Sequence, residues 1–109
     1  MNSADDILSR LSQTLLARRD ADPTTSYTAK LLAKGQDAIL KKIGEETTEL
    51  VMAAKDGDRQ HLVCEAADVL YHMMVLLACN GLTIDEVRQE LHRREGVSGI
   101  QEKNSRGQA

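Results

Sequence analysis

Two pairs of carboxylates stand out in this sequence because both have the spacing of one helical turn. Glu46 is followed three residues later by Glu49, and Glu65 is followed three residues later by Asp68. Residues three apart lie on the same face of a helix, so each pair would project to one side. Acids gathered beside the surface between two packed helices repel one another and lose hydration unless cations bind there. The pattern therefore indicates a cation site.

The type of ligand narrows the choice of cation. Clustered carboxylates without cysteine suit hard, oxygen-seeking ions, so Mg²⁺ is the first candidate, Mn²⁺ the second, and zinc a poor fit. A ferritin-like di-iron site would require Glu-x-x-His pairs, whereas the second pair here ends in Asp68, with His72 one turn further on. Mg²⁺ held by few protein ligands usually keeps water and substrate phosphate in its other positions. The expected ligand is a metal-bound polyphosphate.

Helices must carry these acids, since the sequence is rich in Ala, Leu, Glu and Lys and contains one proline, Pro23. Turn signals divide the chain at Gly35, at Asp56-Gly57-Asp58 and at Asn80-Gly81. Helices are expected from just after a Ser3 cap to about Arg19, over 26–34, over 36–55, over 59–79 and from Thr83 to about Arg94. Residues from about 96 to 109 are glycine-rich and polar, and we expect this tail to be loosely ordered or ligand-dependent.

The short connection at 56–58 predicts that the two long helices form an antiparallel hairpin. Their carboxylates would then face each other, and Glu46 would interrupt the apolar face formed by Ile39, Ile43 and Leu50. A solvated helix face is the ordinary explanation for a single Glu-x-x-Glu pair. Two pairs on consecutive helices favour convergence on one site.

Composition excludes several classes of protein. A length of 109 residues fits one domain, 1–109, and a net charge of −3 with only two aromatic residues argues against nucleic-acid binding. The acidic start of the chain is unlike a signal peptide, and we expect no apolar run of the roughly 20 residues that span a bilayer. A cytoplasmic protein is expected. Cys64 and Cys79, about 22 Å apart on one helix, cannot pair there and are expected to be buried.

The helix expected over 59–79 has an apolar arc that covers nearly half its circumference. One neighbouring helix cannot cover so wide an arc, so we expect a homodimer. The predicted fold is thus all-α, a bundle of four to five helices completed by a second copy. The arc consists of Leu62, Ala66, Val69, Leu70, Met73, Leu76 and Leu77.

The acidic segments resemble a known family. Residues 45–49 followed by 65–68 are similar to the E-E-x-x-E…E-x-x-D signature of the MazG-like all-α nucleotide pyrophosphatases. Residues 26–32, 41–46, 65–72 and the tail 94–103 more specifically resemble the phosphoribosyl-ATP pyrophosphatase branch, across roughly residues 5–106. The resemblance implies hydrolysis of the α–β phosphoanhydride of 1-(5-phosphoribosyl)-ATP in histidine biosynthesis. It also implies that Glu46, Glu49, Glu65 and Asp68 bind Mg²⁺, with Glu45 as a further ligand or as the base that orients water.

Basic residues should complement the phosphates of such a substrate. The candidates are Lys30, Lys41, Lys42, Arg93 and Arg94, while Lys103 and Arg106 on the tail could fold over bound polyphosphate. Tyr27 could contact base or ribose, or could instead cap the edge of the core. His72 is expected to support or pack against the site rather than bind the metal.

Two alternatives stay open at this point. A MazG-like enzyme acting on a standard or modified nucleoside triphosphate would share the metal site and differ in residues 26–32 and 93–106. A helical interaction module could instead use its acids to bind cations for stability alone. The sequence leaves open the number of metal ions, the carboxylate that activates water and the contacts to base and ribose.

Overall fold

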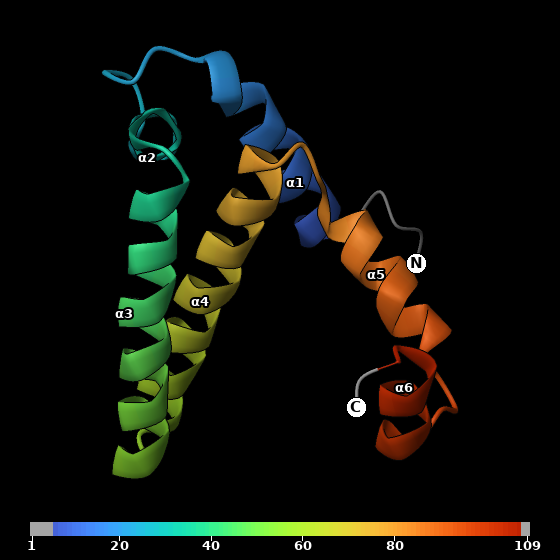
Figure 1. The fold of residues 1–109 in the computed structure, drawn as a ribbon. Coiled ribbons are helices and arrows are strands. Elements are labelled where there is room, and N and C mark those ends of the chain that lie inside the picture. The colour runs from blue at the N-terminus through green and yellow to red at the C-terminus, as the bar shows by residue number, and fades with distance from the viewer. Residues whose placement is uncertain (1–5, 108–109) are drawn as a thin grey trace.

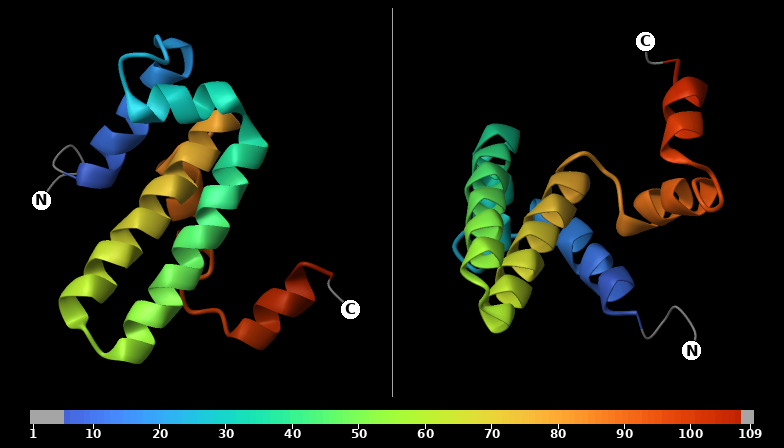
Figure 2. Two further views of the ribbon diagram at one scale, coloured as in Figure 1. Left: turned by 90° about the vertical axis from the view of Figure 1, so that its left-hand side faces the viewer. Right: turned by 90° about the horizontal axis from the view of Figure 1, so that it is seen from below.

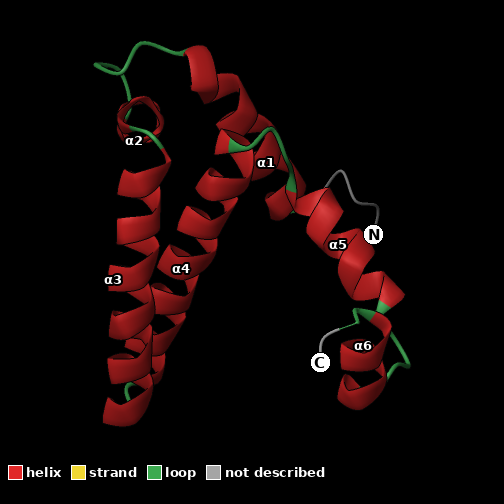
Figure 3. Ribbon diagram, viewed as in Figure 1, coloured by secondary structure: helices red, strands yellow, loops and turns green. Residues whose placement is uncertain are grey.

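The computed structural model describes residues 6–107, and within that range every regular element is a helix (Figure 3). Six α-helices follow one another, with a turn of 3-10 helix, Arg18–Asp20, after the first (Figure 1). The all-α prediction is therefore confirmed, with one helix more than expected. The helices are α1 (Ile7–Ala17), α2 (Tyr27–Lys34), α3 (Gln36–Asp56), α4 (Arg59–Cys79), α5 (Ile84–Arg93) and α6 (Gly99–Ser105).

Side-chain caps begin the helices close to the predicted positions. Ser26 accepts a hydrogen bond from the Ala29 N–H at the start of α2, and Asp58 accepts one from His61 at the start of α4. Asp6 is the cap of α1, where its side chain accepts a hydrogen bond from the Leu8 N–H. The predicted Ser3 cap lies outside the described residues. Gly57, with φ 77°, ends α3 in the left-handed region that glycine adopts without strain.

The long helices α3 and α4 form the predicted antiparallel hairpin and run side by side along their length (Figure 2). At the end of the hairpin remote from Gly57, α1 packs on α4 and α2 packs on α3. Most of the core lies at this end, because only here do four helices meet. Its buried members are Leu15, Leu31, Ile39, Met74, Val75, Ala78 and Ile84.

The apolar arc of α4 is not the face that the single chain buries. Leu70 and Met73 are 36% and 44% exposed, whereas Met74 and Val75, outside the predicted arc, are buried. The reason is that α4 is apolar on nearly all sides, and α1 and α3 cover one side only. Cys64 is exposed, so the expectation that both cysteines are buried was wrong.

The last two helices leave the hairpin: α5 extends away from the end where α1 packs, and α6 follows beyond the far end of α5 (Figure 1). Within the tail expected to be loosely ordered or ligand-dependent, residues 99–105 form a helix, and the mobility of the tail stays a prediction. Ser98 and Gln101 cap its start reciprocally, each side chain accepting from the other residue's backbone N–H.

Helix α4 is long and apolar enough, by length and composition alone, to cross a membrane, contrary to the expectation that no run approached that length. One such helix is weak evidence, since core helices also pass this test. Glu65 and Asp68 lie in its middle, and α3 packs along it. Charged groups at mid-helix are costly in a bilayer, so the apolar surface of α4 fits a protein contact better.

Candidate metal and phosphate site

Three of the four predicted carboxylates meet across the α3–α4 hairpin. One oxygen from each of Glu46, Glu49 and Glu65 lies within 4.8 Å of the other two. Glu65 is buried, Glu46 is partly buried and Glu49 is exposed, so the group opens to solvent on one side. This arrangement follows from the hairpin, which sets the one-turn pair of α3 opposite the middle of α4.

Glu65 has an incomplete set of partners. Its Oε2 atom lies 3.1 Å from Nε2 of His61, one turn earlier on α4. Its Oε1 atom is buried and has no hydrogen-bond partner. A buried carboxylate oxygen without a partner is costly, and a divalent cation between the three acids would supply one. The donor set, three carboxylates with one face open to water, fits Mg²⁺ or Mn²⁺.

Asp68 lies one turn beyond Glu65 on α4 but is outside the group of three oxygens in the single chain. Its side chain is exposed, and its backbone carbonyl accepts a hydrogen bond of 2.8 Å from Nδ1 of His72. Asp68 as a metal ligand therefore stays a prediction. The structure does not place the Asp68 carboxylate with those of Glu46, Glu49 and Glu65, so its geometry does not support this assignment.

His72 is buried and both ring nitrogens are engaged, in keeping with a supporting role. Because a carbonyl can only accept, Nδ1 carries the proton that it donates to Asp68, and Nε2 accepts from the Tyr27 hydroxyl at 3.1 Å. Next to this bond, the hydroxyls of Thr28 and Tyr71 also pair. These contacts hold α2 against α4. Tyr27 nevertheless remains 53% exposed, so its ring is open to a ligand.

Lysines line the surface between α2 and α3, close to the acids. Nζ of Lys42 lies 3.9 Å from Glu45 and 3.8 Å from Glu46, so this lysine is partly neutralised by the acidic group. Lys42 and Glu45 also border a pocket of about 390 Å³ lined by Tyr27, Leu31, Lys34, Ala38, Lys41, Lys42 and Glu45. Sequence reasoning did not find Lys34. Its position one turn after Lys30 was the available signal.

Arg93, Arg94 and Lys103 lie on α5 and α6, which extend away from the hairpin (Figure 1). The structure does not bring these three side chains to the group formed by Glu46, Glu49 and Glu65 of the same chain. Arg93 donates to both oxygens of buried Glu102, and Arg106 lies 3.3 Å from Glu102. Arg106 thus has an acidic partner without a ligand, unlike the expected substrate-dependent pairing.

The hydrogen bonds in this second cluster perturb two carboxyl groups. The side chains of Arg93 and Arg94 lower the pKa of Glu90 to about 2. Hydrogen bonding from Arg93 also lowers the pKa of Glu102. Both acids therefore remain ionised in weakly acidic solution. The cluster joins α5 to α6, and no sequence signal singled out Glu102 as its centre.

The chain is similar to known proteins over most of its length. Residues 8–95 match the family model described as phosphoribosyl-ATP pyrophosphohydrolase. The chain is 64% identical over 105 residues to a phosphoribosyl-ATP pyrophosphatase of Dechloromonas aromatica, covering 96% of this chain and 97% of that protein. It is 59% identical over 100 residues to the protein so named in Methylibium petroleiphilum, covering 92% and 83% of the two chains. A third, from Chromobacterium violaceum, is 55% identical over 101 residues, covering 93% and 94%. The chain belongs to the phosphoribosyl-ATP pyrophosphohydrolase family.

Proposed function

We propose that this protein hydrolyses the α–β phosphoanhydride of 1-(5-phosphoribosyl)-ATP, releasing pyrophosphate and 1-(5-phosphoribosyl)-AMP, in histidine biosynthesis. The observation that carries the proposal is the group of three carboxylates in a member of this family. The buried, unpartnered oxygen of Glu65 supports a cation at that group. Attack of water on a phosphoanhydride is favoured by neutralisation of phosphate charge, which a metal beside lysines would provide.

Glu46, Glu49 and Glu65 would hold Mg²⁺, with Mn²⁺ as the second candidate, and Asp68 is the remaining proposed ligand. The bound ion would neutralise phosphate charge and lower the pKa of bound water. Glu45 lies one residue before Glu46 and borders the lysine pocket, so it can serve as a ligand or orient the attacking water. Lys41 and Lys42 would bind phosphate on the α3 side, and Tyr27 would contact the nucleoside.

We also propose that the protein is a homodimer in the cytoplasm. The accessible surface of the single chain is 7610 Å², whereas a compact 12.0 kDa monomer exposes about 6000 Å². The radius of gyration, 16.1 Å, also exceeds the roughly 13 Å expected for a compact domain of this length. Exposed apolar side chains contribute to this surface. Val63, Ala66, Leu70 and Met73 form an exposed stripe at helical spacing along α4. A second copy on this stripe would also bring another α5–α6 unit into the assembly, which is where Arg93, Arg94 and Lys103 would act.

Pyrophosphate release tests this function. The purified protein is incubated with Mg²⁺ and either phosphoribosyl-ATP, ATP or dCTP, with a parallel series in which Mn²⁺ replaces Mg²⁺ and a control with excess chelator. We expect release from phosphoribosyl-ATP that the chelator abolishes. Preference for ATP or dCTP would favour a nucleoside triphosphate pyrophosphatase of the MazG type. Absence of release from all three with either metal would favour a non-catalytic helical module.

A further inference from the structure

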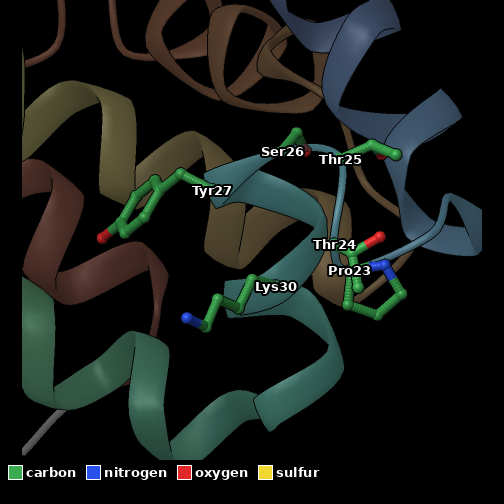
Figure 4. Close-up of a pocket in the computed structure, with 6 residues that line it drawn as sticks. All are labelled: Pro23, Thr24, Thr25, Ser26, Tyr27 and Lys30. Carbon is green, nitrogen blue, oxygen red and sulfur yellow. The ribbon is translucent and has the colours of Figure 1, made fainter.

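Tyr27 lines two pockets at the surface of α2. One is the lysine pocket of about 390 Å³ on the α3 side. The other, of about 520 Å³, is lined by Pro23, Thr24, Thr25, Ser26, Tyr27 and Lys30. Figure 4 shows Tyr27 and Lys30 extending from α2 to the same side, with Pro23 and Thr24 on the preceding loop. Both pockets have volumes in the range of small-molecule sites.

The two pockets differ in their distance along the chain from the metal ligands. The lysine pocket ends at Glu45, the residue next to Glu46, and its Lys42 contacts Glu46 directly. It also has an apolar wall formed by Leu31 and Ala38. The lysines beside the acids match the phosphates of a nucleotide whose scissile bond lies at the metal. The apolar wall, further from the acids, matches its base.

The pocket of Lys30, which Tyr27 also lines, has a different character. Its hydroxyl groups are largely engaged, because Thr24 and Thr25 bond to Asp22 and Ser26 caps α2. Lys30 is exposed and, among residues 6–107, its ammonium group has neither an acidic partner nor a hydrogen bond. This lysine is the one charged side chain that lines the pocket. A phosphate monoester on a sugar would satisfy it, with the pentose against Pro23 and the Tyr27 ring.

We propose that Lys30 binds the 5-phosphate of the second ribose, the group that distinguishes phosphoribosyl-ATP from ATP. The inference rests on the proposed function and assigns the two pockets different parts of its substrate. The lysine pocket of α3 receives the adenosine side, which both nucleotides share, and the Lys30 pocket receives the phosphoribosyl group. Lys30 is then a specificity-determining residue, whereas Lys34, one turn later on the same helix, serves both ligands alike.

Binding of the two product-like ligands tests this division without requiring turnover. Dissociation constants of phosphoribosyl-AMP and AMP are measured by calorimetry with Mg²⁺ for the wild type, Lys30→Gln, Lys30→Arg and the matched variant Lys34→Gln. A charged contact to phosphate is worth about tenfold in affinity at an exposed site. We expect Lys30→Gln to weaken the binding of phosphoribosyl-AMP about tenfold and the binding of AMP less than twofold. Lys30→Arg should retain the preference, and Lys34→Gln should weaken both ligands by the same factor.

The proposal would be overturned if Lys30→Gln weakened the binding of both ligands equally or changed the binding of neither. It would also be overturned if the wild type bound AMP as tightly as phosphoribosyl-AMP. The proposed function fails separately, through lack of pyrophosphate release from phosphoribosyl-ATP by the wild type. Circular dichroism of each variant verifies that the helices are intact. Because Lys30 is exposed on the surface of α2, the fold should tolerate its replacement.

Discussion

Nε2 of His61 and Oε2 of Glu65 form a hydrogen bond of 3.1 Å on one face of α4 that satisfies a single oxygen of the carboxylate. The other oxygen of Glu65 is buried and unpartnered beside Glu46 and Glu49. The pair therefore fixes the orientation of the Glu65 side chain without neutralising the group of acids. Lys42, 3.8 Å from Glu46, offsets only part of the negative charge of the three carboxylates, and a bound cation would offset the rest.

Replacing Glu65 with Met should separate the stability of the fold from metal binding. Removing a buried, partly unsatisfied carboxylate should stabilise the metal-free protein by about 1 kcal/mol. Thermal unfolding is measured at one protein concentration, with and without Mg²⁺. The wild type should gain stability on adding Mg²⁺, whereas Glu65→Met should be more stable without metal and should not respond to it. A wild type indifferent to both Mg²⁺ and Mn²⁺ would contradict the site.

Glu49→Gln should abolish most of the activity while leaving the fold intact, because Glu49 is exposed and contributes little to the core. Loss of one metal ligand should lower the rate of pyrophosphate release about 100-fold or more at fixed Mg²⁺. Glu95→Gln is the matched control, since Glu95 is an exposed acid paired with His92 outside this site. Activity that survives in Glu49→Gln at the level of the control would rule out the proposed role.

Local signals were sufficient to predict the hairpin and much of the acidic site. Gly57 and Asp58 mark the turn, and the spacing of Glu46 and Glu49 on α3 fixes which side they face. The convergence of three acids follows from this geometry. The exclusion of Asp68 from the group cannot be predicted in this way, because the side-chain direction at that position depends on how closely α4 approaches α3.

The errors have a common cause in long-range packing. On α4, periodicity could not distinguish the face buried by Met74 and Val75 from the exposed face that carries Cys64, since both are apolar. Helix α6 was missed although Ser98 and Gln101 form a recognisable capping box. Its docking through Glu102 depends on Arg93, nine residues earlier, and such a pairing cannot be read from local propensity.

Tyr27→Phe should weaken the attachment of α2 to α4. The change removes the hydroxyl that donates to Nε2 of His72 and leaves that buried nitrogen without its donor. The expected loss in free energy of unfolding is about 1 to 2 kcal/mol, measured by urea denaturation. A double-mutant cycle with His72→Phe checks the cause, because the effect of Tyr27→Phe should largely vanish in that background. An undiminished effect would mean that the hydroxyl acts elsewhere.

Met73→Glu should dissociate the proposed homodimer, because it places a charge in the exposed apolar stripe of α4. Sedimentation velocity at micromolar concentration should show a dimer for the wild type and a monomer for the variant. Ile7→Glu is the matched control, since Ile7 is 61% exposed at the start of α1, away from that stripe. A monomeric wild type, or a Met73→Glu variant as dimeric as the control, would contradict the proposed interface.

The attachment of α6 to α5 should depend on pH through Glu90 and Glu102. Arginine hydrogen bonds lower the pKa of Glu90 from 4.5 to about 2, and that of Glu102 is lowered too. A lowered pKa in the folded state means that the ionised acids stabilise the cluster above about pH 4.5. This stabilisation is lost as the pH falls from there toward 2.

Hydrogen exchange of the α6 amides measures this attachment. Protection factors for residues 99–105 should be constant above pH 5 and fall below it, before those of α3 and α4 change. Glu102→Gln removes the charge that Arg93 and Arg106 share, so its α6 should already exchange faster at pH 7. The same protection in Glu102→Gln and wild type at pH 7 would show that α6 is held by other contacts, and the buried carboxylate would then need another explanation.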